Sequence, residues 1–191
     1  NNISLDEVTP ELRRHAKTLN FGMVYGMGAR AFAESSGLSL AEAKRFIKEY
    51  FENFEGIKTY QDSVIAFAKT HGYVKTETGR RRYLPDITSG NPKFQSQAER
   101  AAINMPTQGL AADIMKLAMI NAAEWIKKNK YEDSVKLLLS IHDEMVFEVK
   151  DDTIKDVASE IKHIMENAFT LSVPIVVDVK TGKNWGDMKR I

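Results

Sequence analysis

The sequence contains no cysteine, and its four histidines are scattered along the chain. These absences exclude disulfide scaffolds, cysteine nucleophiles, thiolate metal sites and a zinc site built on closely spaced histidines. No apolar run approaches the roughly 18–20 residues that a membrane-spanning helix needs. No signal peptide opens the chain, so we expect a cytoplasmic protein with no membrane partner. The first residue is not methionine, and we expect the chain to be a fragment of a longer protein.

The composition is otherwise that of a globular protein. The 191 residues are 43% hydrophobic and 28% charged, with 27 basic and 26 acidic side chains. This length predicts one domain or two small, tightly packed subdomains. Residues 1–140 carry 20 basic and 16 acidic side chains, whereas residues 141–170 carry 3 basic and 8 acidic side chains. A mildly basic surface that faces an acidic pocket suits a protein that holds a polyanion and also binds cations.

Helix signals dominate the first two thirds of the chain. Thr9 can cap a helix that starts at Pro10. Ser39 and Glu42 form a capping-box pattern at the start of a second helix. The apolar spacing predicts further helices over residues 57–70, 95–128 (with a kink or restart at Pro106) and 152–169.

Strand signals are concentrated in the last third. Apolar or alternating segments predict strands over residues 73–78, 135–141, 145–149 and 173–179. The order, many helices followed by β-β-α-β, predicts an α+β fold. In that fold a small antiparallel sheet is covered by helices.

The first predicted helix carries two cations and two aromatic rings on one face. Arg13, Lys17, Phe21 and Tyr25 are each four residues apart, so they spread over about 120° of the helix surface. Two fixed cations near a helix N-terminus suit a triphosphate, and aromatic rings can lie against a sugar or stack on a base. Two simpler interpretations stay open: a solvated cationic face, or core rings beside cations whose heads reach the solvent.

An acidic tip is predicted between two strands. His142-Asp143-Glu144 separates two apolar segments, where two carboxylates are costly unless they lie in a turn or bind cations. A hairpin tip satisfies both conditions. The simpler alternative is an exposed hairpin whose tip happens to be charged.

A third set of polar residues follows the same four-residue spacing. Arg100, Asn104 and Gln108 can donate to the acceptors that every base pair presents in the DNA minor groove, or they can cap a helix around Pro106. The basic run that includes Arg80 and Arg81 can meet DNA phosphates or form a solvated turn.

These segments resemble family A DNA polymerases, the bacterial DNA polymerase I family. The segment from Arg13 to Gly26 resembles the family's motif B, in which an arginine, a lysine, a phenylalanine and a Tyr-Gly pair have these spacings. The segment His142-Asp143-Glu144-Met145-Val146-Phe147-Glu148-Val149 resembles motif C. Further similarity lies in residues 78–85, 99–113 and 182–185, so the resemblance extends from Thr9 to Trp185.

The resemblance implies roles for the residues of the first helix. Arg13 and Lys17 would hold the triphosphate of an incoming dNTP. Phe21 would pack near the sugar and Tyr25 near the templating position. Lys17 would also serve as general acid toward the pyrophosphate leaving group.

The resemblance also implies a metal site and a DNA surface. Asp143 would bind catalytic Mg²⁺, with Glu144 as an auxiliary carboxylate and His142 near the primer end. The residues expected to contact primer–template DNA are Arg80, Arg81, Arg100, Asn104, Gln108 and His142. The implied reaction is template-directed nucleotidyl transfer from a dNTP to a primer 3′ end by a two-metal mechanism. The stripe on the first helix and the acidic tip would face each other across the width of a nucleoside triphosphate.

The implied organisation is a helical fingers subdomain followed by part of a palm. Residues 1–90 would form the fingers, with the motif B helix at about 9–26. Residues 91–191 would form the C-terminal part of the palm, with the motif C hairpin at about 135–149. The resemblance implies a location in the bacterial cytoplasm, associated with the nucleoid, or in an organelle.

One family motif has no match in the sequence. Motif A, an Asp-Tyr-Ser-Gln-Ile-Glu-Leu-Arg-like strand, supplies the other metal-binding aspartate in the family. We therefore expect this chain alone to be inactive and to need the rest of a polymerase chain, including motif A and the thumb. We also expect an open sheet edge with exposed apolar surface.

Two other classes of protein remain possible at this point. Single-subunit RNA polymerases share the Arg-x3-Lys-x7-Tyr-Gly helix and a His-Asp turn, but they usually carry a non-aromatic residue at the position of Phe21 and serine at the position of Glu144. The second alternative is a non-catalytic nucleic-acid-binding module derived from a polymerase. The presence of Arg13, Lys17 and Asp143 favours an enzyme.

Overall fold

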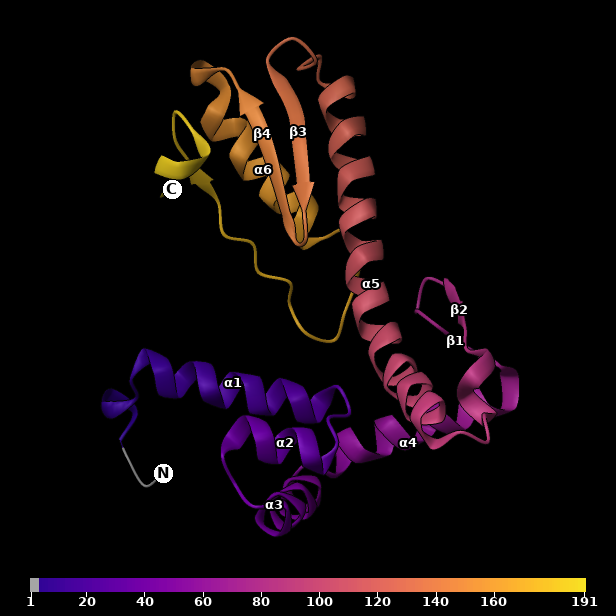
Figure 1. Cartoon of the computed structure of the whole chain (residues 1–191). Coiled ribbons are helices and arrows are strands. Elements are labelled where there is room, and N and C mark those ends of the chain that lie inside the picture. Colours follow the sequence, from indigo (N-terminus) through magenta and orange to yellow (C-terminus); the bar gives the residue numbers. More distant parts are fainter. Residues whose placement is uncertain (1–3) are drawn as a thin grey trace. The chain divides into compact units, whose positions relative to one another are not determined.

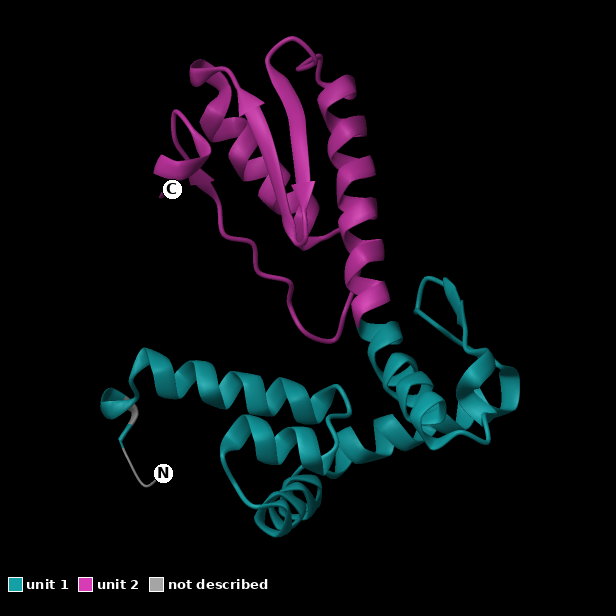
Figure 2. Cartoon of the chain, in the orientation of Figure 1, with its two compact units in different colours: residues 1–107 teal, residues 108–191 magenta. Residues whose placement is uncertain are grey.

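The computed structural model describes residues 4–191, and the chain forms two compact units (Figure 2). The first unit ends at Thr107, and the second runs from Gln108 to Ile191. Each unit has its own buried apolar residues, as expected for parts that fold around separate cores.

Helices form most of the first unit (Figure 1). They are α1 (Pro10–Val24), α2 (Ala29–Ser36), α3 (Leu40–Asn53), α4 (Glu55–His71) and the N-terminal part of α5 (Pro92–Lys128), with 3-10 turns at Leu5–Glu7 and Pro85–Thr88.

Both predicted helix starts are confirmed. The Thr9 hydroxyl oxygen accepts a hydrogen bond from the backbone N–H of Leu12 at 3.2 Å. Ser39 and Glu42 form the reciprocal capping box: the Glu42 N–H donates to the Ser39 hydroxyl at 3.3 Å, and the Ser39 N–H donates to the Glu42 carboxylate at 2.9 Å. Hydrogen bonds from the Ser39 side chain and backbone lower the pKa of Glu42, because they stabilise its charged form.

Helix α2 was not predicted from the sequence. Gly28 is its N-cap and Gly37 its C-cap, with a φ of 74° that glycine adopts at little cost. Between them, Phe32 is 1% exposed and packs with Met23 and Ala43 in a core shared by α1, α2 and α3. Tertiary packing of this one ring makes a short helix favourable where the sequence pattern is weak.

A small hairpin follows α4. Strands β1 (Tyr73–Lys75) and β2 (Arg81–Tyr83) pair antiparallel, so the predicted strand over residues 73–78 ends earlier than expected. The Thr76 N–H already donates to the Arg80 carbonyl at 2.9 Å, which closes the turn. Arg81 is therefore a strand residue and Arg80 precedes it. Beneath the hairpin lies a second core formed by Ala68, Val74, Leu84, Ile87, Ala98, Ala102 and Met105.

The second unit places a two-stranded sheet against two helices (Figure 1). Its elements are the C-terminal part of α5, β3 (Val135–Ile141), β4 (Glu144–Val149), α6 (Ile154–Glu166), β5 (Lys180–Thr181) and β6 (Lys189–Arg190), with 3-10 turns at Asp151–Thr153 and Trp185–Asp187. Its core contains Ala122, Ile126, Val135, Val157 and Ile161. Helices thus cover one face of an antiparallel hairpin, and the predicted α+β class is confirmed.

Apolar side chains on β3 remain exposed, as expected. A bulge lies between Leu137 and Leu139, and the relative exposures of Leu138 and Leu139 are 54% and 46%. Within the described residues β3 and β4 pair only with each other, so the sheet has open edges.

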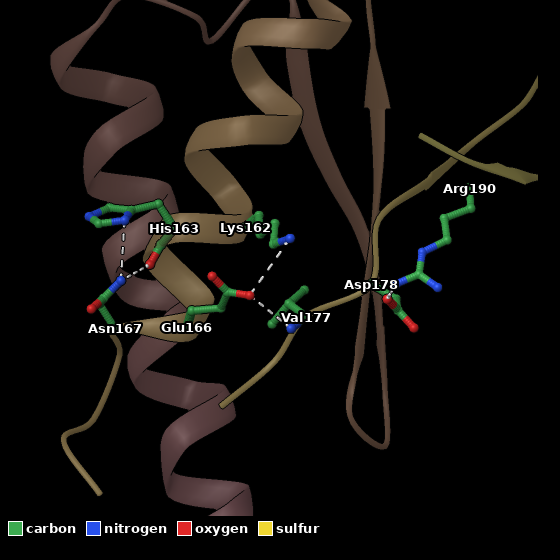
Figure 3. A network of polar contacts seen from close by, with 7 residues as sticks. All are labelled: Lys162, His163, Glu166, Asn167, Val177, Asp178 and Arg190. Atoms are coloured by element: carbon green, nitrogen blue, oxygen red, sulfur yellow. Dashed lines mark hydrogen bonds and ion pairs between the residues drawn. The ribbon is translucent and has the colours of Figure 1, made fainter. Parts of the chain in front are cut away.

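The predicted final strand over residues 173–179 is wrong. The segment is extended coil, with Val173 63% exposed and Val176 76% exposed. Its Val177 N–H donates to the Glu166 carboxylate of α6 at 3.0 Å, and Asp178 pairs with Arg190 (Figure 3). A strand requires a neighbouring backbone, and here backbone pairing reaches only the last residue, where the Ile191 N–H donates to the Val179 carbonyl at 3.2 Å.

Helix α5 is continuous through Pro106 and contributes to both units. It does not restart at the proline. The Tyr60 hydroxyl donates to the Ile103 carbonyl at 3.1 Å, which gives this weakened turn an additional hydrogen bond. Ala98 lies in the core of the first unit and Ala122 in that of the second. The boundary between the two compact units therefore falls between residues 107 and 108, inside this helix. The expected division into fingers and palm between residues 90 and 91 concerns functional subdomains and stays a prediction.

Among the helices of residues 4–191, none combines sufficient length with sufficient apolar character to cross a membrane.

The left-handed C-cap of α2 gives a testable prediction. Gly37→Ala should lower the free energy of unfolding by roughly 1 kcal/mol, because alanine is strained at positive φ. Gly56→Ala is the matched control. At both positions the new methyl group would meet no atom within 4 Å, but Gly56 has the ordinary helical backbone of α4. The control should be neutral or slightly stabilising. Urea unfolding followed by circular dichroism would test this, and equal effects of the two substitutions would contradict it.

Candidate nucleotide and DNA site

The predicted stripe on α1 borders a hollow in the surface of the first unit. The hollow has a volume of about 410 Å³, and its lining residues include Arg13, Lys17 and Phe21. Phe21 is 48% exposed, and its ring stacks on that of Tyr25 with a centroid distance of 6.1 Å and an interplanar angle of 13°. The structure thus brings together the cations and one ring at the hollow, with the second ring directly beside them.

The opposite face of α1 explains why the stripe is exposed. Met23 is 1% exposed and lies in the core with Phe32, and Leu19 packs against the same core. This apolar edge fixes the rotation of the helix and turns the stripe outward. The interpretation of Phe21 as a core ring is therefore wrong. The cations Arg13 and Lys17 are exposed, and in the described part of the chain no carboxylate pairs with either.

The C-terminal end of α1 is held by an amide that the sequence analysis missed. The side-chain amide of Gln61, on α4, donates to the carbonyl oxygens of Met23 at 2.9 Å and Val24 at 3.1 Å. Gln61 is only 7% exposed. The spacing in the sequence does indicate that Gln61 is buried. It lies on the inward face of α4 with Val64 and Ala68, at positions i, i+3 and i+7. A buried glutamine on such a face must find partners, and helix-end carbonyls lack them.

Asn104 makes a second connection to the same helix end. Its side-chain amide donates to the Tyr25 carbonyl at 3.3 Å and to the Arg100 carbonyl at 2.7 Å. The Asn104 side-chain oxygen is buried and has no hydrogen-bond partner among residues 4–191. In this structure Asn104 positions the end of α1, next to the residue expected at the templating position. Arg100 and Gln108 are both exposed, and the Arg100 guanidinium donates to the Ser96 hydroxyl at 2.8 Å.

The acidic tip is a tight hairpin turn in the second unit. Ile141 pairs with Glu144 in the ladder, so His142 and Asp143 form a two-residue loop. His142 has a φ of 52°, in the left-handed region that histidine enters more readily than most residues. His142, Asp143 and Glu144 are all exposed. The carboxylates therefore project from a rigid turn toward solvent.

The donor set at this tip fits part of a magnesium site. Mg²⁺ usually takes one or two protein carboxylates and completes its shell with water and substrate phosphates. Asp143 and Glu144 offer oxygen ligands of this kind. Across residues 4–191 no group of three or more histidine, aspartate or glutamate residues has the arrangement of a metal site. A complete two-metal site would need a further carboxylate.

The β1–β2 hairpin presents arginines beside aromatic rings. The Arg81 guanidinium carbon lies 4.7 Å from the centroid of the Tyr73 ring, and Tyr83 is 69% exposed. The backbone N–H of Arg80 donates to the Thr76 hydroxyl at 3.1 Å. The aromatic contact fixes the Arg81 side chain at the surface of the hairpin, where it can still donate to a phosphate.

Known proteins are similar to this chain in both sequence and fold. The model of DNA polymerase family A matches residues 1–187. DNA polymerase I of Bacillus caldotenax is 45% identical over 187 residues, which are 98% of this chain and 21% of that protein. The thermostable DNA polymerase I of Thermus filiformis is 41% identical over 183 residues, which are 96% of this chain and 22% of that protein.

A solved structure agrees with the sequence comparison. The POL domain of Pol1 from M. smegmatis, in complex with DNA primer-template and dNTP, matches with a TM-score of 0.84 and 42% identity. The match covers 90% of this chain and 30% of that one. This chain belongs to DNA polymerase family A. This family membership argues against the alternative that the chain is related to single-subunit RNA polymerases. The chain spans 21–22% of the length of these two relatives.

The role of Gln61 can be tested by its removal. Gln61→Leu should lower the free energy of unfolding by about 1–3 kcal/mol, because the Val24 carbonyl loses its side-chain donor and the Met23 carbonyl keeps only the Gly26 N–H at 3.2 Å. Gln97→Leu, at an exposed position of α5, is the matched control and should change the value by less than about 0.5 kcal/mol. Denaturant unfolding curves would measure both, and a Gln61→Leu curve that overlays the wild type would refute the assignment.

Proposed function

We propose that this chain is the fingers and C-terminal palm part of a DNA-directed DNA polymerase. The reaction is template-directed nucleotidyl transfer from a dNTP to the 3′ end of a primer. The observation that carries the proposal is the hollow on α1, where Arg13, Lys17 and Phe21 meet in a chain of this family. The M. smegmatis neighbour holds DNA primer-template and dNTP, which supports the same ligands here.

The α1 residues would bind the incoming nucleotide. Arg13 and Lys17 present donors and positive charge to the triphosphate, and the α1 N-terminus adds a partial positive charge. Phe21 would pack against the sugar, and Tyr25 would lie near the templating position. During transfer the primer 3′ oxygen would lose its proton to solvent and form a bond to the α-phosphorus. The bond from the α-phosphorus to the bridging oxygen would break, and Lys17 would protonate the departing pyrophosphate.

The hairpin tip would hold the catalytic metal. Asp143 is the proposed ligand, Glu144 the auxiliary carboxylate, and His142 a neighbour of the primer end. Bound Mg²⁺ ions would lower the pKa of the primer hydroxyl and stabilise the leaving pyrophosphate. In the family, motif A supplies the second metal-binding aspartate, and the sequence contains no match to that motif. The 191-residue chain alone should therefore not extend a primer.

The DNA would be held by side chains that do not read base identity. Arg100 and Gln108 can donate to minor-groove acceptors, and Arg80 and Arg81 can contact phosphates. Asn104 would act mainly by positioning the end of α1. We propose residues 1–90 as fingers and residues 91–191 as palm, with α5 continuing across the structural division at residue 107.

The metal assignment predicts a large loss of activity. In a complete polymerase that contains this segment, Asp143→Asn should lower the primer-extension rate roughly a thousandfold, because several kcal/mol of charge stabilisation are lost. Primer–template affinity should remain. Glu148→Gln, on the same hairpin, is the control and should keep normal activity. Near-normal turnover of Asp143→Asn would contradict the assignment and favour a non-catalytic binding module.

The nucleotide assignment predicts an effect on substrate use. Arg13→Ala or Lys17→Ala should raise the KM for dNTP roughly tenfold or more, since each removes a charged hydrogen-bond donor from the triphosphate. Lys17→Ala should also lower kcat if the lysine donates a proton. Lys48→Ala removes a distant surface cation of α3 and should leave both constants unchanged. Steady-state kinetics with varied dNTP would decide, and an unchanged KM in both α1 variants would exclude the proposed contacts.

A further inference from the structure

Three successive backbone carbonyls at the end of α1 accept hydrogen bonds from side chains of other helices. The Gln61 amide of α4 donates to Met23 at 2.9 Å and to Val24 at 3.1 Å. The Asn104 amide of α5 donates to Tyr25 at 3.3 Å. The last carbonyls of a helix have no intrahelical donors, and at a surface water often supplies them. Here side chains supply them, so the end of α1 is attached to two other helices.

Of the two amides, the one of Gln61 is committed to α1 alone. The Asn104 amide is shared with the Arg100 carbonyl of its own helix, which lies nearer at 2.7 Å. Gln61 directs its donors to two carbonyls of α1, and its side chain is 7% exposed. A side chain buried in this way does not reach a nucleotide or a DNA strand. Any effect of Gln61 on a ligand must therefore pass through α1.

The residue that follows these carbonyls is Tyr25, and the backbone largely fixes the place of its ring. The ring is half-buried and stacks on Phe21, which is itself 48% exposed and therefore a weak support. After Tyr25 the chain turns at Gly26, which has a φ of 79°. A Cβ at Gly26 would lie 3.0 Å from the Ile103 side chain, so this turn packs closely on α5. Gln61 restrains the backbone before the ring, and the turn restrains it after the ring.

A firmly supported ring at this place can help to reject wrong base pairs. The proposed function puts Tyr25 near the templating position. A mismatched pair differs in shape from a correct pair, so it must displace the groups around it. A ring on a fixed backbone resists displacement, whereas a ring on a frayed helix end yields. Selectivity is a difference between two transition-state free energies, and a yielding ring lowers the penalty for the mismatch more than it affects the correct pair.

We propose that Gln61 is a positioning residue for base-pair selection, which acts by holding the Met23 and Val24 carbonyls and thereby the ring of Tyr25. This inference rests on the proposed function. It adds to that function a buried residue that lies outside the nucleotide and DNA contacts.

The first test measures the support itself in the 191-residue chain. Gln61→Met keeps the length of the side chain but removes both donors. Native-state hydrogen exchange of the backbone amides of residues 21–27 should become about tenfold faster, because the helix end loses its hydrogen bonds to α4. Unchanged exchange in this segment would overturn the proposal.

The matched control removes stability elsewhere in the same unit. Val74 is 1% exposed in the core beneath the β1–β2 hairpin, and Val74→Ala should lower the midpoint of thermal unfolding. Exchange of residues 21–27 should stay within twofold of the wild type. Equal acceleration in Val74→Ala and Gln61→Met would assign the effect to general destabilisation and overturn the proposal.

The second test measures selectivity in a complete polymerase that contains this segment. The ratio of kcat/KM for the correct dNTP to that for a mismatched dNTP should fall about fivefold in Gln61→Met, with less than a threefold change for the correct dNTP. A merely structural role would reduce the amount of active enzyme and lower both values equally. Val74→Ala should therefore keep the wild-type ratio. A wild-type ratio in Gln61→Met, or an equal fall in Val74→Ala, would overturn the proposal.

A double-mutant cycle tests whether Gln61 acts through Tyr25. Tyr25→Ala removes the ring, so Gln61→Met should cause no further loss of selectivity in that background. Losses that multiply in the double variant would overturn the proposal, because Gln61 would then act by another route.

The two assays separate this inference from the proposed function. If the unaltered complete polymerase extends no primer, the proposed function fails, and the exchange measurement alone decides whether Gln61 supports α1. If primers are extended normally and Gln61→Met keeps the wild-type selectivity, the inference fails and the proposed function stands.

Discussion

The backbone carbonyls at the end of α1 need hydrogen-bond donors from other helices, and the candidate nucleotide site depends on this constraint. A helix end leaves its last carbonyls without intrahelical donors. Here Gln61 of α4 and Asn104 of α5 supply those donors to Met23, Val24 and Tyr25. These bonds, together with the buried side chain of Met23, fix the position and rotation of the helix. Because the apolar edge is inside, the cations and rings must be outside.

Charge is distributed in the first unit according to the same logic. Two surface cations of α3, Arg45 and Lys48, pair with glutamates one turn away, whereas the cations Arg13 and Lys17 that border the hollow on α1 have no such partner in the described residues. A protein that binds a polyanion benefits from cations held apart from its own carboxylates, because an internal ion pair would compete with the ligand. The acidic hairpin tip of the second unit has the opposite sign, as a cation site requires.

Local chemistry explains which parts of the fold could be predicted. The caps at Thr9 and Ser39 depend on neighbouring residues, and both were correctly predicted. The strand expected over residues 173–179 depends on a backbone partner far away in the sequence, and it did not form. The sequence pattern did not predict α2 for a related reason. This helix depends on burial of Phe32 against Met23 and Ala43, which lie on other helices. The boundary between the two compact units lies inside α5, because this helix is continuous through Pro106 and packs in both cores.

The sequence by itself determined the family, the four-residue stripe of α1 and the carboxylates between the two strands, because spacing along a helix and motif identity are properties of adjacent residues. Only the tertiary structure decided that Phe21 is exposed and that Asn104 and Gln61 support the end of α1. These features join residues from separate helices. Such contacts are fixed by packing and by the need to satisfy buried polar groups, which no local pattern encodes.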